Sequence, residues 1–315
     1  MGTLFRIVLY APDEETAKKA AGAAFTRIAQ LDQCMSDYKP DSELIQFCEK
    51  AGGEPVHLSD DLFDILTKSQ EISRASNGAF DVTVGPLVRL WRLSRRKREL
   101  PPEDILAKNK AVVGYEKLIL DPTTHTGRLT QKGMILDLGG IGKGYAVAKA
   151  LGVLKEHGIS SALVVGGGEV GVSAPPPGLE GWTVGIAPLE DPSKAPSVYL
   201  LLHDASVSTS GDAEQYVEIG GVRYSHHIDP RTGLGLTVHS SVSVVAPAGV
   251  LADGLTTAAC ILGPEAGMKF LEDIPGIAAL FVVGTKDGQK AIESRRWKDV
   301  PKTGPKKESA EAKTP

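Results

Sequence analysis

Apolar residues recur every three to four positions in two early segments, which is the spacing of an amphipathic helix. The first segment follows a strand-like run over residues 4–9, and its apolar positions are Ala17, Ala21, Ala24, Ile28, Leu31 and Met35. The second is predicted to begin at Ser59 as the N-cap, and its apolar positions are Leu62, Ile65, Leu66 and Ile72. Asn77-Gly78 is predicted to end it, because these residues tolerate the left-handed conformation.

Beyond residue 90 the patterns are shorter and more mixed. Residues 92–111 are charged and contain two adjacent prolines, so we predict a surface excursion there. The region 160–245 is rich in strand-like runs that are separated by turn residues. The other predicted elements are strands over 117–120, 134–138 and 277–283, and helices over 143–157, 252–262 and 264–273.

Strands and helices are interspersed without a strict strand–helix repeat. This arrangement predicts an α+β fold of mixed or antiparallel sheets with packed helices, rather than a doubly wound sheet. We expect one globular domain over residues 1–300 and a disordered Lys/Glu/Pro-rich tail over 301–315.

Composition excludes several classes of protein. The chain has 315 residues, 42% of them hydrophobic, and a net charge of -4, so nucleic-acid binding has no electrostatic support. Its three cysteines lie far apart without a C-x-x-C motif, which indicates neither a disulfide framework nor a zinc site. No apolar run approaches the length of a membrane span, and no signal peptide is visible at the N-terminus.

A glycine-rich segment from Asp137 to Tyr145 lies between a predicted strand and a predicted helix. Backbone N–H groups at a helix N-terminus bind phosphate, and Lys143 would add a positive charge. The alternative is a plain tight turn. A literal G-x-G-x-x-G also occurs at residues 166–171, but three prolines follow it soon after, so we interpret it as a bend between strands.

Two further segments carry candidate chemistry. Asp253 and Thr257 are four residues apart, so on a helix they share a face and offer hard oxygen ligands that suit Mg²⁺. His226 and His227 precede an Asp-Pro turn, and histidine is the usual general base near neutral pH. Taken alone, each pattern is more often structural: a helix N-cap with a partly buried threonine, or a pair of packing histidines.

The order of these segments resembles one family, the FAD:protein FMN transferases or ApbE family. The motifs that carry the resemblance span residues 1–285, and the most specific are D-L-G-G-I-x-K-G from Asp137 and H-x-I-D-P-R-T-G from His226. The family resemblance implies that the chain uses Mg²⁺ to transfer FMN from FAD to a threonine or serine hydroxyl, releasing AMP. The acceptor would be a flavoprotein subunit of a respiratory electron-transfer complex.

The resemblance also implies roles for individual residues. The FAD site, in a central cleft, would be lined by Met1, Tyr38, Ala79, Phe80, Asp81, Asp137, Lys143 and Ile228. The metal would be held by Asp253, Thr257 and the backbone carbonyl of Gly140, and His226 would be the base. If residues 223–228 are extended, His226 and Ile228 share one face and His227 points away from the flavin.

The chain departs from the family pattern at several positions. Members commonly carry alanine where Gly142 stands, and some carry an aspartate ligand where this chain has Thr256. His227 replaces a usually aliphatic residue. The resemblance implies a periplasmic or cell-envelope location, but the missing signal peptide leaves the cytoplasm open. Two rival functions also stay open: an FAD pyrophosphatase that yields FMN and AMP, and a non-catalytic flavin-binding protein.

Overall fold

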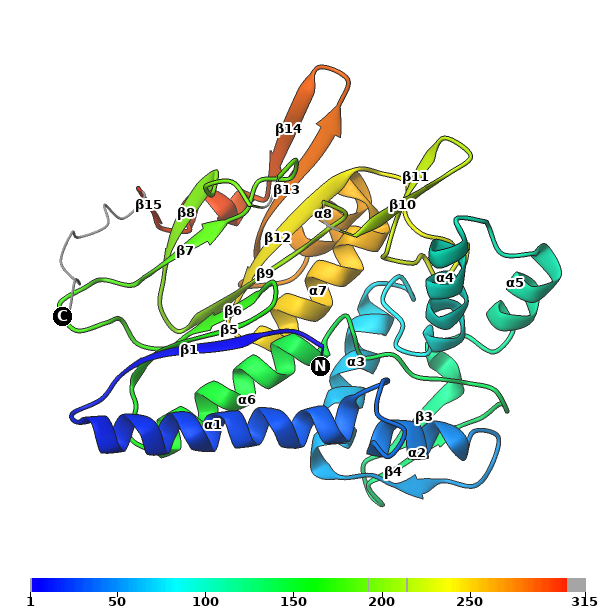
Figure 1. The fold of residues 1–315 in the computed structure, drawn as a ribbon, viewed down its shortest axis with the longest axis horizontal. Helices are drawn as coiled ribbons and strands as arrows, with labels where there is room; N and C mark the ends of the chain where they lie inside the picture. The colour runs from blue at the N-terminus through cyan, green and yellow to red at the C-terminus, as the bar shows by residue number, and fades with distance from the viewer. Residues whose placement is uncertain (1, 192, 214, 305–315) are drawn as a thin grey trace.

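The computed structural model describes residues 2–191, 193–213 and 215–304. Helices and antiparallel strands are mixed along the chain, as Figure 1 shows, which confirms the predicted α+β class. No helix in these ranges is both long and apolar enough to cross a membrane. The α-helices are α1 (Glu14–Met35), α2 (Glu43–Glu49), α3 (Asp60–Ala75), α4 (Gly85–Lys97), α5 (Glu103–Lys110), α6 (Gly142–Glu156), α7 (Gly249–Leu262) and α8 (Pro264–Glu272).

The largest sheet has seven strands in the order β1-β5-β6-β9-β12-β13-β14, all paired antiparallel. These strands are β1 (Phe5–Tyr10), β5 (Ser161–Gly166), β6 (Glu169–Val172), β9 (Ala205–Gly211), β12 (Ser240–Ala246), β13 (Ala278–Thr285) and β14 (Gly288–Glu293). The smaller sheets are β15-β8-β7, β2-β4-β3 and the hairpin β10-β11. Their strands are β2 (Val56–His57), β3 (Leu118–Asp121), β4 (Thr126–Leu129), β7 (Trp182–Ile186), β8 (Val198–Leu202), β10 (Tyr216–Ile219), β11 (Val222–Ser225) and β15 (Lys302–Thr303).

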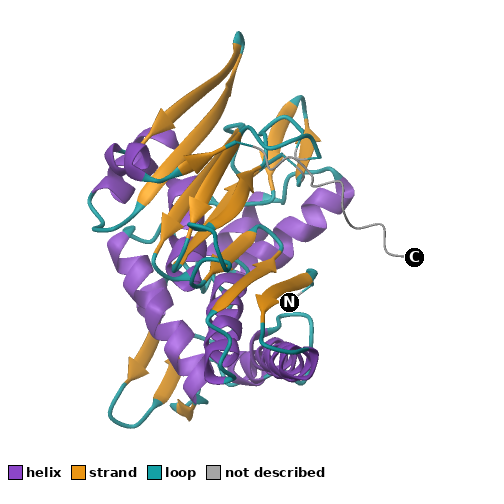
Figure 2. Cartoon of the chain, turned by 90° about the vertical axis from the view of Figure 1, so that its left-hand side faces the viewer, coloured by secondary structure: helices purple, strands orange, loops and turns teal. Residues whose placement is uncertain are grey.

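The large sheet is covered on both faces, so its interior strand β12 is buried along its whole length. Because side chains alternate between faces, Val244 packs in the core shared with α3, α6 and α7, whereas Val245 packs against β7, β8 and Trp297. Figure 2 shows the helices gathered against one side of the sheet. Helices α6 and α7 both contact β6, and their first turns meet at Gly144 and Gly249.

The strongest sequence patterns gave correct elements. Ser59 is the N-cap of α3, and its side chain accepts a hydrogen bond from the Leu62 N–H at 3.3 Å. Asn77 and Gly78 follow that helix with φ of 51° and 76°, the left-handed conformation that was predicted to end it. The bend at residues 166–171 is the tight turn between β5 and β6.

The segment over residues 92–111 lies largely at the surface, as predicted, but two unpredicted helices occupy it: α4 extends to Lys97, and α5 spans Glu103–Lys110 with none of its residues buried. Helix α4 is amphipathic: its charged side chains lie on one face, and the other face buries Leu87 and Trp91. The proline pair is compatible with both helices, since it lies between them and Pro102 is the N-cap of α5.

One predicted strand is absent from the described residues. Residues 134–138 make only one isolated bridge, between Ile135 and Val84. The strand predicted over 277–283 is β13, and β14 and β15 follow it. Of the predicted tail, Lys302 and Thr303 form β15 and pair with β8, and residues 305–315 lie outside the described ranges.

Candidate functional site

The three residues predicted to hold a metal lie together. Helix α7 presents Asp253 and Thr257 on one face, and the Thr257 hydroxyl donates to the Gly140 carbonyl at 3.2 Å. The loop can approach this closely because residue 140 is glycine: a Cβ there would lie 2.9 Å from the Thr257 methyl carbon. A carboxylate, a hydroxyl and a carbonyl are the hard oxygen donors that Mg²⁺ prefers.

Asp253 is almost fully buried and is fixed from two sides. Its Oδ2 accepts a hydrogen bond from the Gly144 N–H at 2.9 Å, at the start of α6. Lys143 Nζ lies 3.7 Å from its Oδ1 and donates to the Gly139 carbonyl at 3.1 Å. The negative charge of Asp253 raises the pKa of Lys143, so this side chain is a permanent cation at the N-terminus of α6.

Helices α6 and α7 touch at a pair of glycines next to this carboxylate. A Cβ on Gly144 would lie 2.1 Å from the Gly249 carbonyl oxygen, and a Cβ on Gly249 would lie 2.5 Å from the Gly144 carbonyl oxygen. Both distances are far below van der Waals contact. The absence of side chains at these two positions therefore lets the first turns of α6 and α7 pack backbone against backbone beside Asp253.

Glu169 belongs to the same cluster and was missed by the sequence analysis. It opens β6 with 2% of its surface exposed, and its Oε1 accepts from the Ser208 hydroxyl at 2.6 Å. Its Oε2 is buried without a hydrogen-bond partner in the described residues. Burial raises the pKa of Glu169, and the charge of Asp253 raises it further, whereas Lys143 acts in the opposite direction. The sequence feature that could have identified Glu169 is its position as a charged residue between the apolar runs of β5 and β6.

These residues fit a divalent cation. The orphaned oxygen of Glu169 and the carboxylate of Asp253 share this buried cluster with one cation, the ammonium of Lys143. No group of three or more His, Cys, Asp or Glu ligands occurs in the described residues, so the donor set is mixed oxygen and unsuited to zinc. Thr256 does not join it, because its hydroxyl donates to the Ala252 carbonyl within α7 at 2.5 Å.

Arg92 on α4 connects two of the predicted cofactor-binding residues. Its guanidinium carbon lies 4.7 Å from the ring centroid of Tyr38, whose surface is 69% exposed. The same guanidinium bonds Asp37 at 2.7 Å and Asp137 at 3.4 Å. Burial raises the pKa of Asp137, while the Gly139 N–H that it accepts and the charge of Arg92 act to lower it. Arg92 was not among the predicted site residues, because α4 itself was not predicted.

Four other predicted cofactor-binding residues contribute differently. Ala79 and Phe80 are buried, and Phe80 packs in the main core. Asp81 accepts from the backbone N–H and the hydroxyl of Thr83 at 2.8 and 2.7 Å, so its carboxylate closes its own turn. Ile228 packs against Leu87, Trp91 and Val217 under the β10–β11 hairpin. Met1 lies outside the described residues.

The two histidines do not face opposite ways, so the prediction from strand alternation was wrong. Strand β11 ends at Ser225, and the chain then bends until Ile228 forms an isolated bridge with Gly235. The rings of His226 and His227 lie 4.0 Å apart between centroids, at 40°. Burial lowers the pKa of His226 to about 4 and that of His227 well below its usual value.

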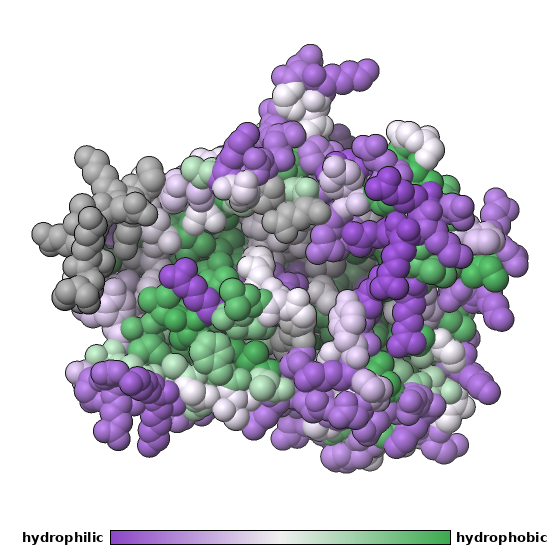
Figure 3. Space-filling model, viewed as in Figure 1, coloured by the Kyte–Doolittle hydropathy of each residue, from purple (hydrophilic) through white to green (hydrophobic). Residues whose placement is uncertain are grey.

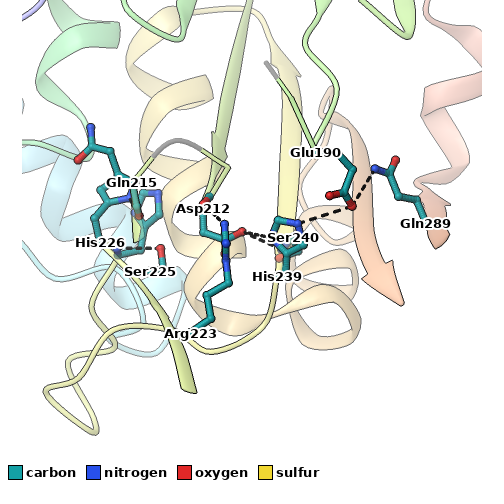
Figure 4. A network of polar contacts seen from close by, with 10 residues as sticks. Glu190, Asp212, Gln215, Arg223, Ser225, His226, His239, Ser240 and Gln289 are labelled. Atoms are coloured by element: carbon teal, nitrogen blue, oxygen red, sulfur yellow. Dashed lines mark hydrogen bonds and ion pairs between the residues drawn. The ribbon is translucent and has the colours of Figure 1, made fainter. Parts of the chain in front are cut away.

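Hydrogen bonding identifies the tautomer of His226. Its Nδ1 lies 3.1 Å from the Gln215 carbonyl oxygen, as Figure 4 shows. A carbonyl only accepts, so Nδ1 carries the proton and Nε2 keeps its lone pair. His226 is therefore a neutral imidazole with one basic nitrogen, which is the form that a general base needs.

Asp212 holds the hairpin that carries His226. This buried carboxylate accepts from Arg223 Nε at 2.6 Å and from the Ser240 N–H at 3.2 Å, and its Oδ1 lies 2.8 Å from His239 Nδ1. In Figure 4 it lies between Arg223 on β11 and His239 before β12. Asp212 thus ties the β10–β11 hairpin to the end of the large sheet.

Comparison with known proteins places these residues in a family. A model described as "ApbE family" matches residues 1–281. A Treponema pallidum protein named FAD:protein FMN transferase is 34% identical over 302 residues, covering 91% of this chain and 83% of its own. A Klebsiella pneumoniae protein of the same name is 33% identical, covering 95% and 86%.

Solved structures agree with the sequence comparisons. The apo flavinyl transferase ApbE of Pseudomonas stutzeri superposes with a TM-score of 0.85 at 30% identity, covering 96% of this chain and 95% of that one. The flavin transferase ApbE of Vibrio cholerae gives 0.83 at 30% identity, covering 95% and 96%. The resemblance inferred from the motif order and the predicted fold class are thereby confirmed.

Proposed function

The chain belongs to the ApbE family, and we propose that it uses Mg²⁺ to move the FMN half of FAD onto a threonine or serine hydroxyl of a partner protein, with release of AMP. The names of its relatives support transfer of flavin from FAD. One observation carries the finer proposal. The Gly140 carbonyl, the Thr257 hydroxyl and the Asp253 carboxylate converge beside Lys143, whose charge also acts on His226.

In the proposed reaction the acceptor oxygen bonds to the phosphorus of the FMN half. The bond from that phosphorus to the bridging oxygen breaks, and its electron pair leaves with AMP. The acceptor hydroxyl loses its proton to Nε2 of His226, the nitrogen that the Gln215 contact leaves free. A positioned base of this kind contributes a factor of about 10²–10⁴ to the rate.

Other groups of the chain would neutralise charge. Lys143 and the N–H groups that start α6 would bind the pyrophosphate, because a helix N-terminus favours anions. Bound by Gly140, Asp253 and Thr257, a magnesium ion would supply Lewis-acid polarisation of the phosphate oxygens. Arg92 would hold Tyr38 and Asp137 in place on the other side of the site.

The test is to incubate the pure protein with FAD, Mg²⁺ and a candidate acceptor domain from a respiratory flavoprotein, and to weigh the acceptor by mass spectrometry. The expected result is an acceptor heavier by one FMN, with AMP in equal amount. Free FMN and AMP with an unmodified acceptor would instead identify an FAD pyrophosphatase. Flavin binding without either product would identify a non-catalytic flavin-binding protein.

A further inference from the structure

One flank of α4 faces the candidate site. Arg92 reaches Asp37, Asp137 and Tyr38 from this flank. Arg95 follows three residues later, so it lies one turn further along the same side of the helix. In Figure 3 strongly hydrophilic residues gather where α4 lies, beside the hollow at the centre of this face.

Helix α4 is fixed beside the β10–β11 hairpin, which leads directly into His226. Trp91 Nε1 donates to the Ser225 carbonyl at 3.0 Å, and the indole packs edge-on against Tyr224. Ser225 directly precedes His226 in the chain. Arg95, one turn after Trp91, is thereby brought to the side of the hairpin that carries the proposed base.

Arg95 differs from Arg92 in having no counter-charge. Its side chain is half-buried, yet it has no hydrogen bond and no ion pair within the described residues. Burial lowers the pKa of Arg95, and the neighbouring charge of Arg92 lowers it further. A desolvated guanidinium next to another cation is unfavourable, and an anion bound between them relieves both costs.

We propose that Arg95 binds a phosphate group of the flavin substrate, so that the anion lies between Arg95 and Lys143 and next to His226. The proposal rests on the proposed function for the identity of the ligand. The planar guanidinium matches two phosphate oxygens at once, which a lone ammonium does not. The charges of Arg95 and Lys143 both lower the pKa of His226, so both cations lie within electrostatic range of that ring.

The test compares Arg95→Met and Arg95→Lys with Arg96→Met. Arg96 is the adjacent exposed arginine on the solvent side of α4 and serves as the matched control. Affinities for FAD, FMN and riboflavin are measured by flavin fluorescence, and AMP is titrated as a competitor. Inorganic pyrophosphate is titrated by calorimetry as a probe that contains no flavin. Thermal melting verifies that each variant is folded.

We expect Arg95→Met to weaken the binding of FAD and of pyrophosphate by about tenfold or more, which is the usual effect of losing a charge-assisted hydrogen bond. Riboflavin should bind as in the wild type, Arg95→Lys should recover part of the loss, and Arg96→Met should change little. A loss of affinity for FMN but not for AMP would place Arg95 on the FMN phosphate. A loss of affinity for AMP but not for FMN would place it on the AMP phosphate.

Several outcomes would overturn the proposal. One is unchanged FAD and pyrophosphate affinity in Arg95→Met, including the case where only the affinity for an acceptor protein falls. A second is a loss of riboflavin affinity in Arg95→Met as large as the loss of FAD affinity. A third is a loss of FAD affinity in Arg96→Met as large as that in Arg95→Met, which would indicate a general effect of positive charge on this helix. A wild type that binds FAD no better than riboflavin would refute the proposed function, while the pyrophosphate titration would still decide the role of Arg95.

Discussion

The Thr257 hydroxyl donates to the Gly140 carbonyl at 3.2 Å, and this single hydrogen bond joins residues 117 positions apart. Both partners are among the three oxygen donors proposed for the metal. The neighbouring Thr256 hydroxyl turns back to the Ala252 carbonyl inside its own helix. Two adjacent threonines of α7 thus have opposite relations to the site, and this contrast allows a controlled experiment.

Thr257→Val should weaken binding of Mn²⁺, used as a spectroscopic substitute for Mg²⁺, by about tenfold or more, because valine keeps the shape and removes a ligand oxygen. Electron paramagnetic resonance of free Mn²⁺ measures the dissociation constant directly. Thr256→Val is the matched control and should bind Mn²⁺ as the wild type does. Equal affinities in the two variants would remove Thr257 from the metal site.

Glu169→Gln should lower metal affinity about 10–100-fold, the usual effect of losing a residue that supports a metal site from behind its ligands. The change keeps the shape of the side chain and removes its ability to ionise beside Asp253 and Lys143. Ser208→Ala is the control, since it removes only the hydrogen bond to Oε1. If both variants bind Mn²⁺ like the wild type, Glu169 is only a packing residue.

His226→Ala should slow acceptor labelling at saturating FAD by about two orders of magnitude, the size of a general-base contribution, and His227→Ala should slow it less. The Gln215 carbonyl holds Nδ1 of His226 and leaves Nε2 free to accept the proton. Because the two rings touch, His227→Ala also tests packing. A severe loss in His227→Ala with a near-normal His226→Ala would reverse the assignment.

The rate should depend on pH through the basic form of His226. Burial lowers the pKa of its imidazole to about 4, so the neutral form predominates at every pH above that value. The acid limb of kcat/KM should therefore lie near pH 4 and not near the usual histidine value of about 6.5. A limb near 6.5 that disappears in His226→Ala would show that the ring is solvated in the working enzyme.

Stability should fall as the pH decreases from about 7 towards 4. The unfolded chain protonates these histidines near their usual pKa, whereas the folded chain keeps His226 and His227 neutral to lower pH. The unfolded state thus binds more protons across that interval, and acid favours it. Urea unfolding at pH 7 and pH 5 measures the difference, which should shrink when both histidines are replaced by glutamine.

Sequence reasoning found the parts of the site that lie within one element. Asp253 and Thr257 share a face of α7 because of their spacing, and the glycine loop before α6 was visible in the composition. Glu169 and Arg92 were missed for a different reason. Their roles depend on β6 lying beside α6 and α7, and on α4 lying beside Asp137, and neither neighbour can be inferred from local periodicity.

The histidine pair shows the same limit in a shorter segment. Alternation holds only while a strand continues, and β11 ends at Ser225, where its carbonyl accepts from Trp91 on α4. The end of the strand thus coincides with a hydrogen bond from α4, whose Trp91 lies 134 residues away in the chain. The fold class was predictable because it depends on the number and order of elements, whereas the direction of each ring depends on packing.

The contact between Gly144 and Gly249 has a consequence for how the protein tolerates change. Even an alanine at either position would collide with a backbone carbonyl of the other helix, so the two helices would have to move apart. In a library of single substitutions selected for labelling activity, these two positions should reject every replacement, although neither has a side chain that could touch the substrate. The separation of α6 and α7 at the site therefore depends on a hydrogen atom, and not a Cβ, at each of these two positions.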